Sequence, residues 1–134
     1  THINSFEVED AASVTSIPGA VTLTAEMPDG KWAVVTSGNR VLAAARLTAA
    51  GISAPAVVVT ADDVTDGKPH PEGYRSAAER LGVEPSLAVV LEDADAGVRA
   101  ARAAGVAAVI GVGERALESD ADVVVRDLTW VSWT

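Results

Sequence analysis

The segment Ala88-Val89-Val90-Leu91-Glu92-Asp93 is an apolar run that ends in two adjacent acids. Two segments upstream have a similar design. Trp32 to Val35 leads into Thr36-Ser37, and Ala56 to Val59 is followed by a loop that contains Lys68. In an open parallel α/β sheet, the carboxyl ends of the strands converge on one crevice. We therefore expect a hydroxyl, a lysine and an acid pair to meet there, a set that suits a phosphate ester and a divalent metal.

Strand-like and helix-like segments alternate from about Ile17 to the C-terminus. The expected strands cover residues 32–36, 56–60, 87–91, 107–112 and 123–125, and the expected helices cover residues 18–27, 41–50, 71–81 and 96–104. This alternation indicates βαβ units and a mostly parallel sheet with helices on both faces. The strands are nearly continuous apolar runs, as expected when both faces of a sheet are covered. The sequence therefore predicts a doubly wound α/β fold.

The composition fits one folded domain and excludes several classes of function. The chain has 134 residues, of which 49% are hydrophobic, and it contains no cysteine, so it is too apolar for a disordered chain and forms no disulfide or thiolate metal site. The net charge of −9 argues against a nucleic-acid partner, which requires a basic face. No apolar run approaches the roughly 20 residues of a membrane span, and the N-terminus lacks signal-peptide character. We expect a cytoplasmic protein without a membrane partner, and the start at Thr1 points to processing or truncation.

Thr36 and Ser37 lie between the first expected strand and the following helix. Hydroxyls and free backbone N–H groups at a helix N-terminus bind anions well. Ser and Thr at such a place are also very common helix caps. Taken alone, this segment leaves both interpretations open.

Lys68 precedes the helix expected over residues 71–81, in a loop that contains Pro69 and Pro71. The two prolines restrict this loop, so the lysine is held in place. A held ammonium can neutralise a phosphate and stabilise charge that develops on its oxygens. The alternative is a solvated lysine in a turn. His70, in the same loop, is expected to be a surface residue without a catalytic role.

Glu92 and Asp93 follow an apolar strand, and adjacent acids need a cation or donors nearby because like charges repel. Mg²⁺ prefers a few carboxylates together with waters and phosphate oxygens. The alternative is an acidic cap on the helix that begins near Ala96, with Asp95 in the same role.

The order and spacing of these groups are more specific than any one of them. Val35-Thr36-Ser37-Gly38, Lys68-Pro69-His70-Pro71 and the segment from Glu92 to Ala101 follow one another as the second, third and fourth motifs do in the haloacid dehalogenase-like (HAD) hydrolase superfamily. The chain resembles this superfamily over about residues 16–130, and it is most similar to members that dephosphorylate small sugar or polyol phosphates. The resemblance implies a Rossmann-like core over residues 16–134, with residues 1–15 as the end of a cap domain and its linker.

The resemblance also implies a Mg²⁺-dependent phosphatase that acts on a small-molecule phosphate ester. Thr36 would hydrogen-bond the transferring phosphoryl group, and Lys68 would neutralise it. Asp93, with Glu92 beside it, would hold Mg²⁺. The expected substrate contacts follow the second motif and are Ser37, Asn39 and Arg40.

The first motif of the family is missing from this chain. That motif is an apolar strand that ends in two acids of Asp-x-Asp spacing, of which the first attacks phosphorus to give an aspartyl-phosphate and the second is the general acid and base. Asp93-Ala94-Asp95 belongs to the fourth motif, and Asp120-Ala121-Asp122 precedes its strand instead of ending one. We therefore expect a truncated chain, the C-terminal part of a larger hydrolase, that is inactive alone because its nucleophile lies outside it. The alternative is a non-catalytic phosphate- or metal-binding module or an inactive fragment.

Two other enzyme or signalling classes fit less well. A receiver-like signalling domain shares the doubly wound layout, but the order Thr, Lys, Glu-Asp argues against it. A dehalogenase needs no metal, whereas the acid pair suits one.

The missing first-motif strand has a consequence for the sheet. In the family it lies at the centre of the strand order 5-4-1-2-3, so the strands that end at Thr36 and Asp93 would lose the neighbour between them. Unpaired strand edges are templates for pairing with another chain. We expect one of three outcomes: a second polypeptide supplies the strand, the two strands close up, or two molecules associate edge to edge.

Overall fold

The computed structural model describes residues 17–133, which form five strands, four α-helices and four short 3₁₀-helices. The strands are β1 (Ala33–Val35), β2 (Val57–Val59), β3 (Val89–Glu92), β4 (Ala108–Val112) and β5 (Val123–Val125). The α-helices are α1 (Ala20–Glu26), α2 (Arg40–Ala49), α3 (Glu72–Leu81) and α4 (Asp95–Ala104). The 3₁₀-helices are η1 (Ala61–Asp63), η2 (Pro85–Leu87), η3 (Glu114–Glu118) and η4 (Leu128–Trp130). The cap segment expected over residues 1–15 lies outside the described residues.

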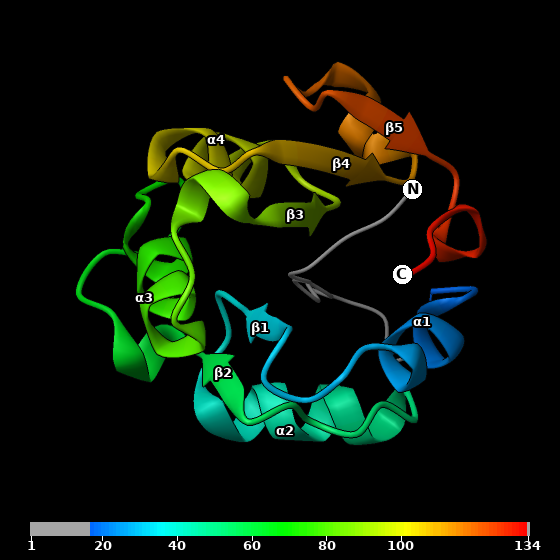
Figure 1. Ribbon diagram of the computed structural model, residues 1–134, viewed down its shortest axis with the longest axis horizontal. Coiled ribbons are helices and arrows are strands. Elements are labelled where there is room, and N and C mark those ends of the chain that lie inside the picture. The colour runs from blue at the N-terminus through cyan, green and yellow to red at the C-terminus, as the bar shows by residue number, and fades with distance from the viewer. Residues whose placement is uncertain (1–16, 134) are drawn as a thin grey trace.

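The strands form two parallel sheets instead of one. β1 pairs with β2, and β4 lies between β3 and β5. Figure 1 shows β1 and β3 facing one another across the middle of the fold, each at the inner edge of its own sheet. The expectation that these two strands close up is therefore wrong.

The core consists of two apolar clusters that both sheets share, because successive strand residues point to opposite faces. The first cluster joins strand residues to α1 and α2 and includes Leu23, Val34, Leu47, Leu91 and Ile110. The second joins strand residues to α3 and α4 and includes Val35, Tyr74, Val90, Val98 and Val109. Helices thus cover both faces, which confirms the doubly wound α/β prediction. Closing β1 onto β3 would require both clusters to repack.

The start of the third strand differs from the prediction. Residues 85–87 form η2 instead, in which the backbone N–H groups of Leu87 and Ala88 donate to the carbonyl oxygens of Glu84 and Pro85 at 2.9 Å each. Pro85 at the first turn of this 3₁₀-helix favours the bend, and the Leu87 side chain is left exposed. β3 therefore begins at Val89 and ends at Glu92, so the first acid of the pair belongs to the strand itself.

The first helix begins at Ala20, two residues after the predicted start at Pro18. Gly19 has a φ of 90° and precedes the helix as its N-cap. A Cβ atom at this position would lie 2.5 Å from the backbone carbonyl carbon of Leu128. Glycine is required here both for the positive φ and for the close approach of η4.

No helix in the described part of the chain is long and apolar enough to cross a membrane.

Candidate active site

Lys68 lies where β1 and β3 both end. Its Nζ donates to the carbonyl oxygen of Val35 at 3.2 Å and to Oε2 of Glu92 at 2.9 Å. Its Nζ also lies 5.3 Å from the centre of the Tyr74 ring. The Lys68 side chain is only 8% exposed, so the alternative of a solvated turn lysine is wrong. Because Val35 ends β1 and Glu92 ends β3, this ammonium links the two sheets at the edge where the sequence predicted the site.

Glu92 is buried, and both of its carboxylate oxygens accept hydrogen bonds. Oε2 accepts from Lys68 Nζ and from the Tyr74 hydroxyl at 2.7 Å, and Oε1 accepts from the backbone N–H groups of Asp93 and Ala94 at 3.0 and 3.2 Å. Burial opposes ionisation, but the charge of Lys68 and these hydrogen bonds hold the pKa of Glu92 below its ordinary value. A carboxylate accepts about four hydrogen bonds in all. The geometry therefore assigns Glu92 to holding Lys68 and the following backbone, and does not favour the predicted role of Glu92 as a metal ligand.

The N-terminal part of α4 packs directly on this carboxylate. A Cβ atom added at Gly97 would lie 1.8 Å from Oε2 of Glu92. The absence of a side chain at Gly97 therefore allows the helix to cover the buried acid and to exclude water from its pairing with Lys68.

Asp93 is the acid at this strand end that a metal ion could approach. Its side chain is 18% exposed, and Oδ2 lies 3.4 Å from Nη1 of Arg115. It lines a cavity of about 380 Å³ together with Gly113, Arg126 and Asp127. Mg²⁺ binds through one or two carboxylates and keeps several waters as ligands, so the Asp93 carboxylate is of the kind that could hold the metal that the resemblance implies, at a cavity that Arg115 and Arg126 also line.

No acidic side chain caps α4, but Asp95 lies in its first turn. A negative charge is favourable there, and Oδ2 of Asp95 lies 3.0 Å from Nε of Arg99. The N-cap residue is Ala94, and no side chain caps the helix there.

Thr36 directly follows β1 and is buried. Its backbone N–H donates to Val59 at 2.9 Å, and its hydroxyl oxygen accepts from the N–H of Gly38 at 3.1 Å. This bond orients the hydroxyl and leaves its proton to be donated elsewhere. The cap of α2 is Asn39, whose Oδ1 accepts from the N–H of Leu42 at 2.8 Å. The helix-cap alternative is therefore wrong for Thr36.

The three predicted substrate contacts divide into two groups. Ser37 is exposed and lines a cavity of about 230 Å³ beside Lys68. Asn39 and Arg40 do not line this cavity, since Asn39 caps α2 and the guanidinium of Arg40 binds Asp63 at 2.6 Å. The structure thus brings Ser37 to the site and uses Asn39 and Arg40 to hold the loop that carries it.

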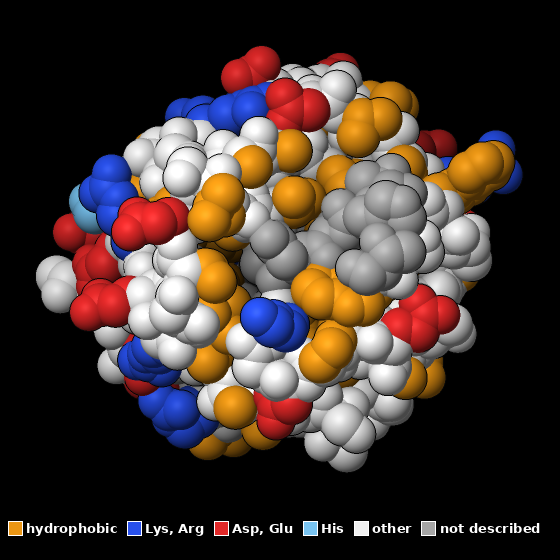
Figure 2. All heavy atoms as spheres, in the orientation of Figure 1, with side chains coloured by type: hydrophobic (Ala, Val, Ile, Leu, Met, Phe, Trp, Pro, Cys, Tyr) orange, Lys and Arg blue, Asp and Glu red, His pale blue; other side chains and the backbone are white. Residues whose placement is uncertain are grey.

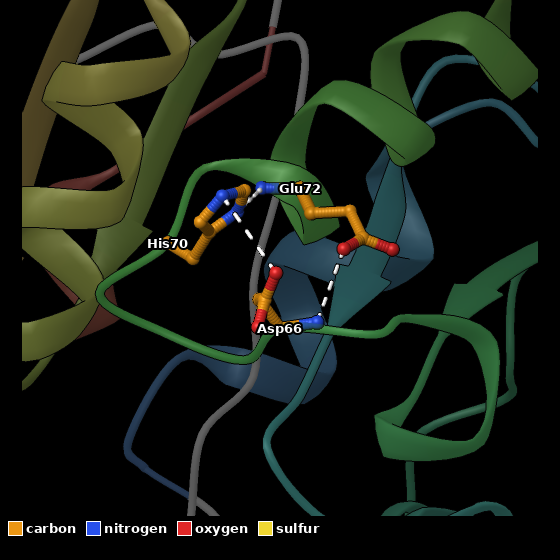
Figure 3. Close-up of side chains that lie close together, drawn as sticks. All are labelled: Asp66, His70 and Glu72. Carbon is orange, nitrogen blue, oxygen red and sulfur yellow. Dashed lines mark hydrogen bonds and ion pairs between the residues drawn. The ribbon is translucent and has the colours of Figure 1, made fainter.

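Asp66, His70 and Glu72 gather in the loop that carries Lys68, as Figure 3 shows, with ligand atoms within 4.8 Å of one another. The Glu72 oxygens accept from the backbone N–H groups of Thr65 and Asp66 at 2.9 and 3.1 Å, which lowers the pKa of Glu72. Nδ1 of His70 accepts from the N–H of Glu72 at 3.1 Å. These bonds tie Glu72 to the backbone of the loop and orient the His70 ring, so the cluster stiffens the loop that carries Lys68. The His70 side chain is 48% exposed, as predicted for a surface residue.

Asp122, the second acid of the segment Asp120-Ala121-Asp122, stabilises the sheet. Its Oδ2 accepts from the N–H of Val109 at 2.7 Å, and its Oδ1 lies 3.0 Å from Nη2 of Arg102. These contacts tie the start of β5 to β4, which is a structural role.

The sequence did not single out two residues that hold the site residues in place. Tyr74 lies within the helix predicted over residues 71–81, where a buried tyrosine hydroxyl needs a partner, and here that partner is Glu92. Asp63 was not singled out, because nothing local in the sequence indicates that it binds Arg40.

Comparison with known proteins shows that this chain is similar to phosphatases over most of its length. The chain is 38% identical to hexitol phosphatase A of Escherichia coli, with all of this chain and 64% of that protein covered. It is 43% identical to validoxylamine A 7'-phosphate phosphatase of Streptomyces hygroscopicus, with 95% of this chain and 65% of that protein covered. The chain thus spans just under two thirds of the length of these relatives.

Solved structures with a similar fold also exist. A HAD family hydrolase from Deinococcus radiodurans, crystallised with bound phosphate and sodium, superposes with a TM-score of 0.76 at 28% identity and covers 87% of this chain and 57% of its own. CbbY from Rhodobacter sphaeroides in complex with phosphate superposes with a TM-score of 0.71 at 31% identity and covers 84% and 54%. Residues 4–105 match the haloacid dehalogenase-like hydrolase family, and the chain therefore belongs to this family.

Proposed function

We propose that this chain is the C-terminal part of a Mg²⁺-dependent phosphatase that hydrolyses a small phosphorylated sugar or polyol. The observation that carries the proposal is the buried ammonium of Lys68, fixed between the ends of β1 and β3. Its two anchors, Val35 and Glu92, are the sequence neighbours of Thr36 and Asp93. A hydroxyl donor, a cation and a carboxylate thus lie at the ends of β1 and β3, and the first two line the same cavity as Ser37.

Phosphoryl transfer is catalysed mainly by positioning and by stabilising charge on the transferring group. Lys68 would place its positive charge against the phosphate oxygens, and Thr36 would donate its hydroxyl proton to one of them. Ser37, at the cavity, would contact the substrate. Asp93 would hold Mg²⁺, which when bound screens the charge between the phosphate and an attacking carboxylate.

The nucleophile in this proposal is an Asp of a segment outside the chain. Its carboxylate attacks phosphorus, the ester P–O bond breaks, and the leaving alcohol takes a proton from a neighbouring acid. Water then hydrolyses the aspartyl-phosphate to free phosphate and regenerates the carboxylate. The chain by itself is therefore expected to release no phosphate.

We further propose that one parallel strand from that segment fits between β1 and β3. Among residues 17–133, no strand pairs with the inner edge of either one. In the orientation of Figure 1, Figure 2 shows several apolar side chains exposed around the middle of this face of the molecule, which suits an apolar strand. The alternative to a strand from that segment is edge-to-edge association of two chains.

A cytoplasmic location remains a prediction.

The test is phosphate release by the full-length protein from a panel of sugar and polyol phosphates in the presence of Mg²⁺. Lys68→Met is expected to lower kcat/KM, per folded molecule, by about 10²–10³-fold, the cost of removing an electrostatic stabiliser. The matched control is Lys31→Met, because Lys31 is exposed and is the other lysine of the chain.

A full-length protein that released no phosphate from any of these esters would reject the phosphatase proposal. Binding of inorganic phosphate together with Mg²⁺ under those conditions would favour the non-catalytic binding module instead.

A further inference from the structure

Arg40 fits the pattern of a substrate contact in the sequence, but the structure gives it a different partner. Its Nη2 donates to Oδ1 of Asp63 at 2.6 Å, and its backbone N–H donates to Oδ2 of Asp62 at 2.9 Å. Asp63 is 23 residues away in the sequence. Both contacts join the start of α2, and with it the loop between β1 and α2, to η1 in the segment after β2.

Asp63 is a point where several bonds meet. Its Oδ2 accepts from both the backbone N–H and the hydroxyl of Thr60, at 2.8 and 3.0 Å. Its Oδ1 accepts from Arg40 and lies 3.9 Å from Nη2 of Arg80. The Asp63 side chain is only 11% exposed, although Arg40 is 60% exposed. The hydrogen bonds from Thr60 and the charge of Arg40 keep the pKa of Asp63 below its ordinary value, so the carboxylate is ionised and ordered near neutral pH.

The two loops joined in this way carry the two groups that would contact phosphate. The first loop, residues 36–39, contains Thr36 and Ser37, and it is also held by a bond of 2.9 Å from the N–H of Ala61 to the carbonyl oxygen of Gly38. The second loop continues from Asp63 to Lys68. A shift between these loops would change the spacing between the Thr36 hydroxyl and the Lys68 ammonium.

We propose that Asp63 is a positioning residue: through Arg40 it holds the loop of Thr36 and Ser37 against the loop that leads to Lys68. Its relevance to catalysis rests on the phosphatase function proposed above. Asp63 does not itself line the cavity beside Lys68, so it would act by fixing where the Thr36 hydroxyl points. Misplacing a catalytic group by about 1 Å can cost a large factor in rate.

Two substitutions break the same link in different ways. Asp63→Asn removes the charge, while an Asn Oδ1 can still accept the bonds from Thr60. Arg40→Gln removes the guanidinium and leaves Asp63 and its bonds to Thr60 intact, so it serves as the test if Asp63→Asn does not fold. Glu79→Gln, at an exposed position on α3, is the matched control.

Amide hydrogen exchange of this chain, measured by mass spectrometry, reports directly on the opening of the loop that contains Thr36 and Ser37. We expect exchange over residues 34–42 to rise by about tenfold in Asp63→Asn and in Arg40→Gln, with no change in the peptide from α4, because loop opening is local. The double variant should match either single variant, since both break one link. Wild-type exchange in both single variants, or additive effects in the double variant, would overturn the proposal.

The kinetic test uses the full-length enzyme with the same three substitutions. At equal folded fractions, kcat/KM should fall by about tenfold in Asp63→Asn and Arg40→Gln but not in Glu79→Gln. If both variants open the loop and keep the kcat/KM of the control, the positioning role is rejected while the phosphatase function stands. If the wild-type protein releases no phosphate while the loop still opens in both variants, the phosphatase proposal fails and the loop link stands.

Discussion

Replacement of Lys68 by Met would leave the charge of Glu92 without its counter-ion in the protein interior. The two groups lie 2.9 Å apart, and their side chains are 8% and 0% exposed. Met has a similar length and no charge, so the substitution removes the ammonium with little change in volume. Glu92 would keep its bonds from the Tyr74 hydroxyl and from two backbone N–H groups.

The loss of stability follows from the geometry. At 2.9 Å and an effective dielectric constant of about 20, the attraction is about 6 kcal/mol before the cost of desolvation is counted. Removal of one partner of a buried pair typically costs about 3–5 kcal/mol. The variant can limit this loss by protonating Glu92, which at pH 7 costs about 3.7 kcal/mol for a carboxyl whose ordinary pKa is about 4.3. We therefore expect a loss of about 3–4 kcal/mol in the free energy of unfolding at pH 7.

The pH dependence of this loss has a definite sign. In the wild type, the pKa of Glu92 is lowered, so its contribution to stability is present above its ordinary pKa and is lost as the pH falls. In Lys68→Met the pKa of Glu92 in the folded state is expected to rise above the ordinary value. The folded variant then binds a proton that the unfolded chain releases, and its stability decreases as the pH increases, by up to about 1.4 kcal/mol per pH unit. At pH 5 the loss should shrink to about 1 kcal/mol.

Urea unfolding at pH 5 and pH 7, followed by tryptophan fluorescence, measures both quantities, since Trp32 is buried in the core. The double variant Lys68→Met/Glu92→Gln should recover most of the loss at pH 7 and remove the added pH dependence, because no buried charge remains. Lys31→Met is the control for the loss of a lysine.

A loss below about 1 kcal/mol at pH 7 would refute this reasoning, since a broken buried pair costs more than that. The same pH slope in Lys68→Met as in the wild type would refute it as well, because it would mean that Glu92 does not protonate.

Three further predictions concern neighbouring features. Gly97→Ala should lower the free energy of unfolding, measured in urea, by about 1–3 kcal/mol, because its Cβ would meet Oε2 of Glu92 at 1.8 Å. Thr36→Val in the full-length enzyme should lower kcat/KM for phosphate release by about 10²-fold, because the hydroxyl donor is lost. A hydrogen bond from Arg102, with other contacts, lowers the pKa of Asp122. The stabilising effect of the ionised Asp122 carboxylate is therefore present above its ordinary pKa and is lost as the pH falls. In Asp122→Asn the urea midpoint should decrease less steeply with pH below pH 5.

Each of these predictions has a matched control. Gly67→Ala adds a methyl group where no atom lies within 4 Å, and a loss of stability equal to that of Gly97→Ala would contradict the steric argument. Thr36→Ser keeps the hydroxyl, so activity as low as in the Val variant would show that the hydroxyl is not what matters. Glu118→Gln should leave the acid dependence unchanged, and an equal effect there would remove the special role of Asp122.

The sequence by itself determined the element order, the doubly wound α/β class and the family. These properties depend on local patterns: apolar runs that end in polar residues, helices that stop at glycine, and three motifs in a fixed order. The α-helix and strand boundaries agree with the structure to within a few residues, except where Pro85 bends the chain into η2 and where Gly19 delays the first helix. Such deviations arise from backbone geometry at single residues, which a pattern of hydrophobicity does not contain.

Only the tertiary structure decided which role each residue of the site has. The acid pair predicted a metal site, but only the folded chain brings Lys68 and Tyr74 to Glu92, 24 and 18 residues away, and so leaves Asp93 to face the cavity. Arg40 likewise needed the fold to find Asp63. A carboxylate or a guanidinium can bind many partners, and which one it meets depends on the packing of distant segments. That is why the sequence could predict the location of the site, while the role of each charged group depended on the tertiary structure.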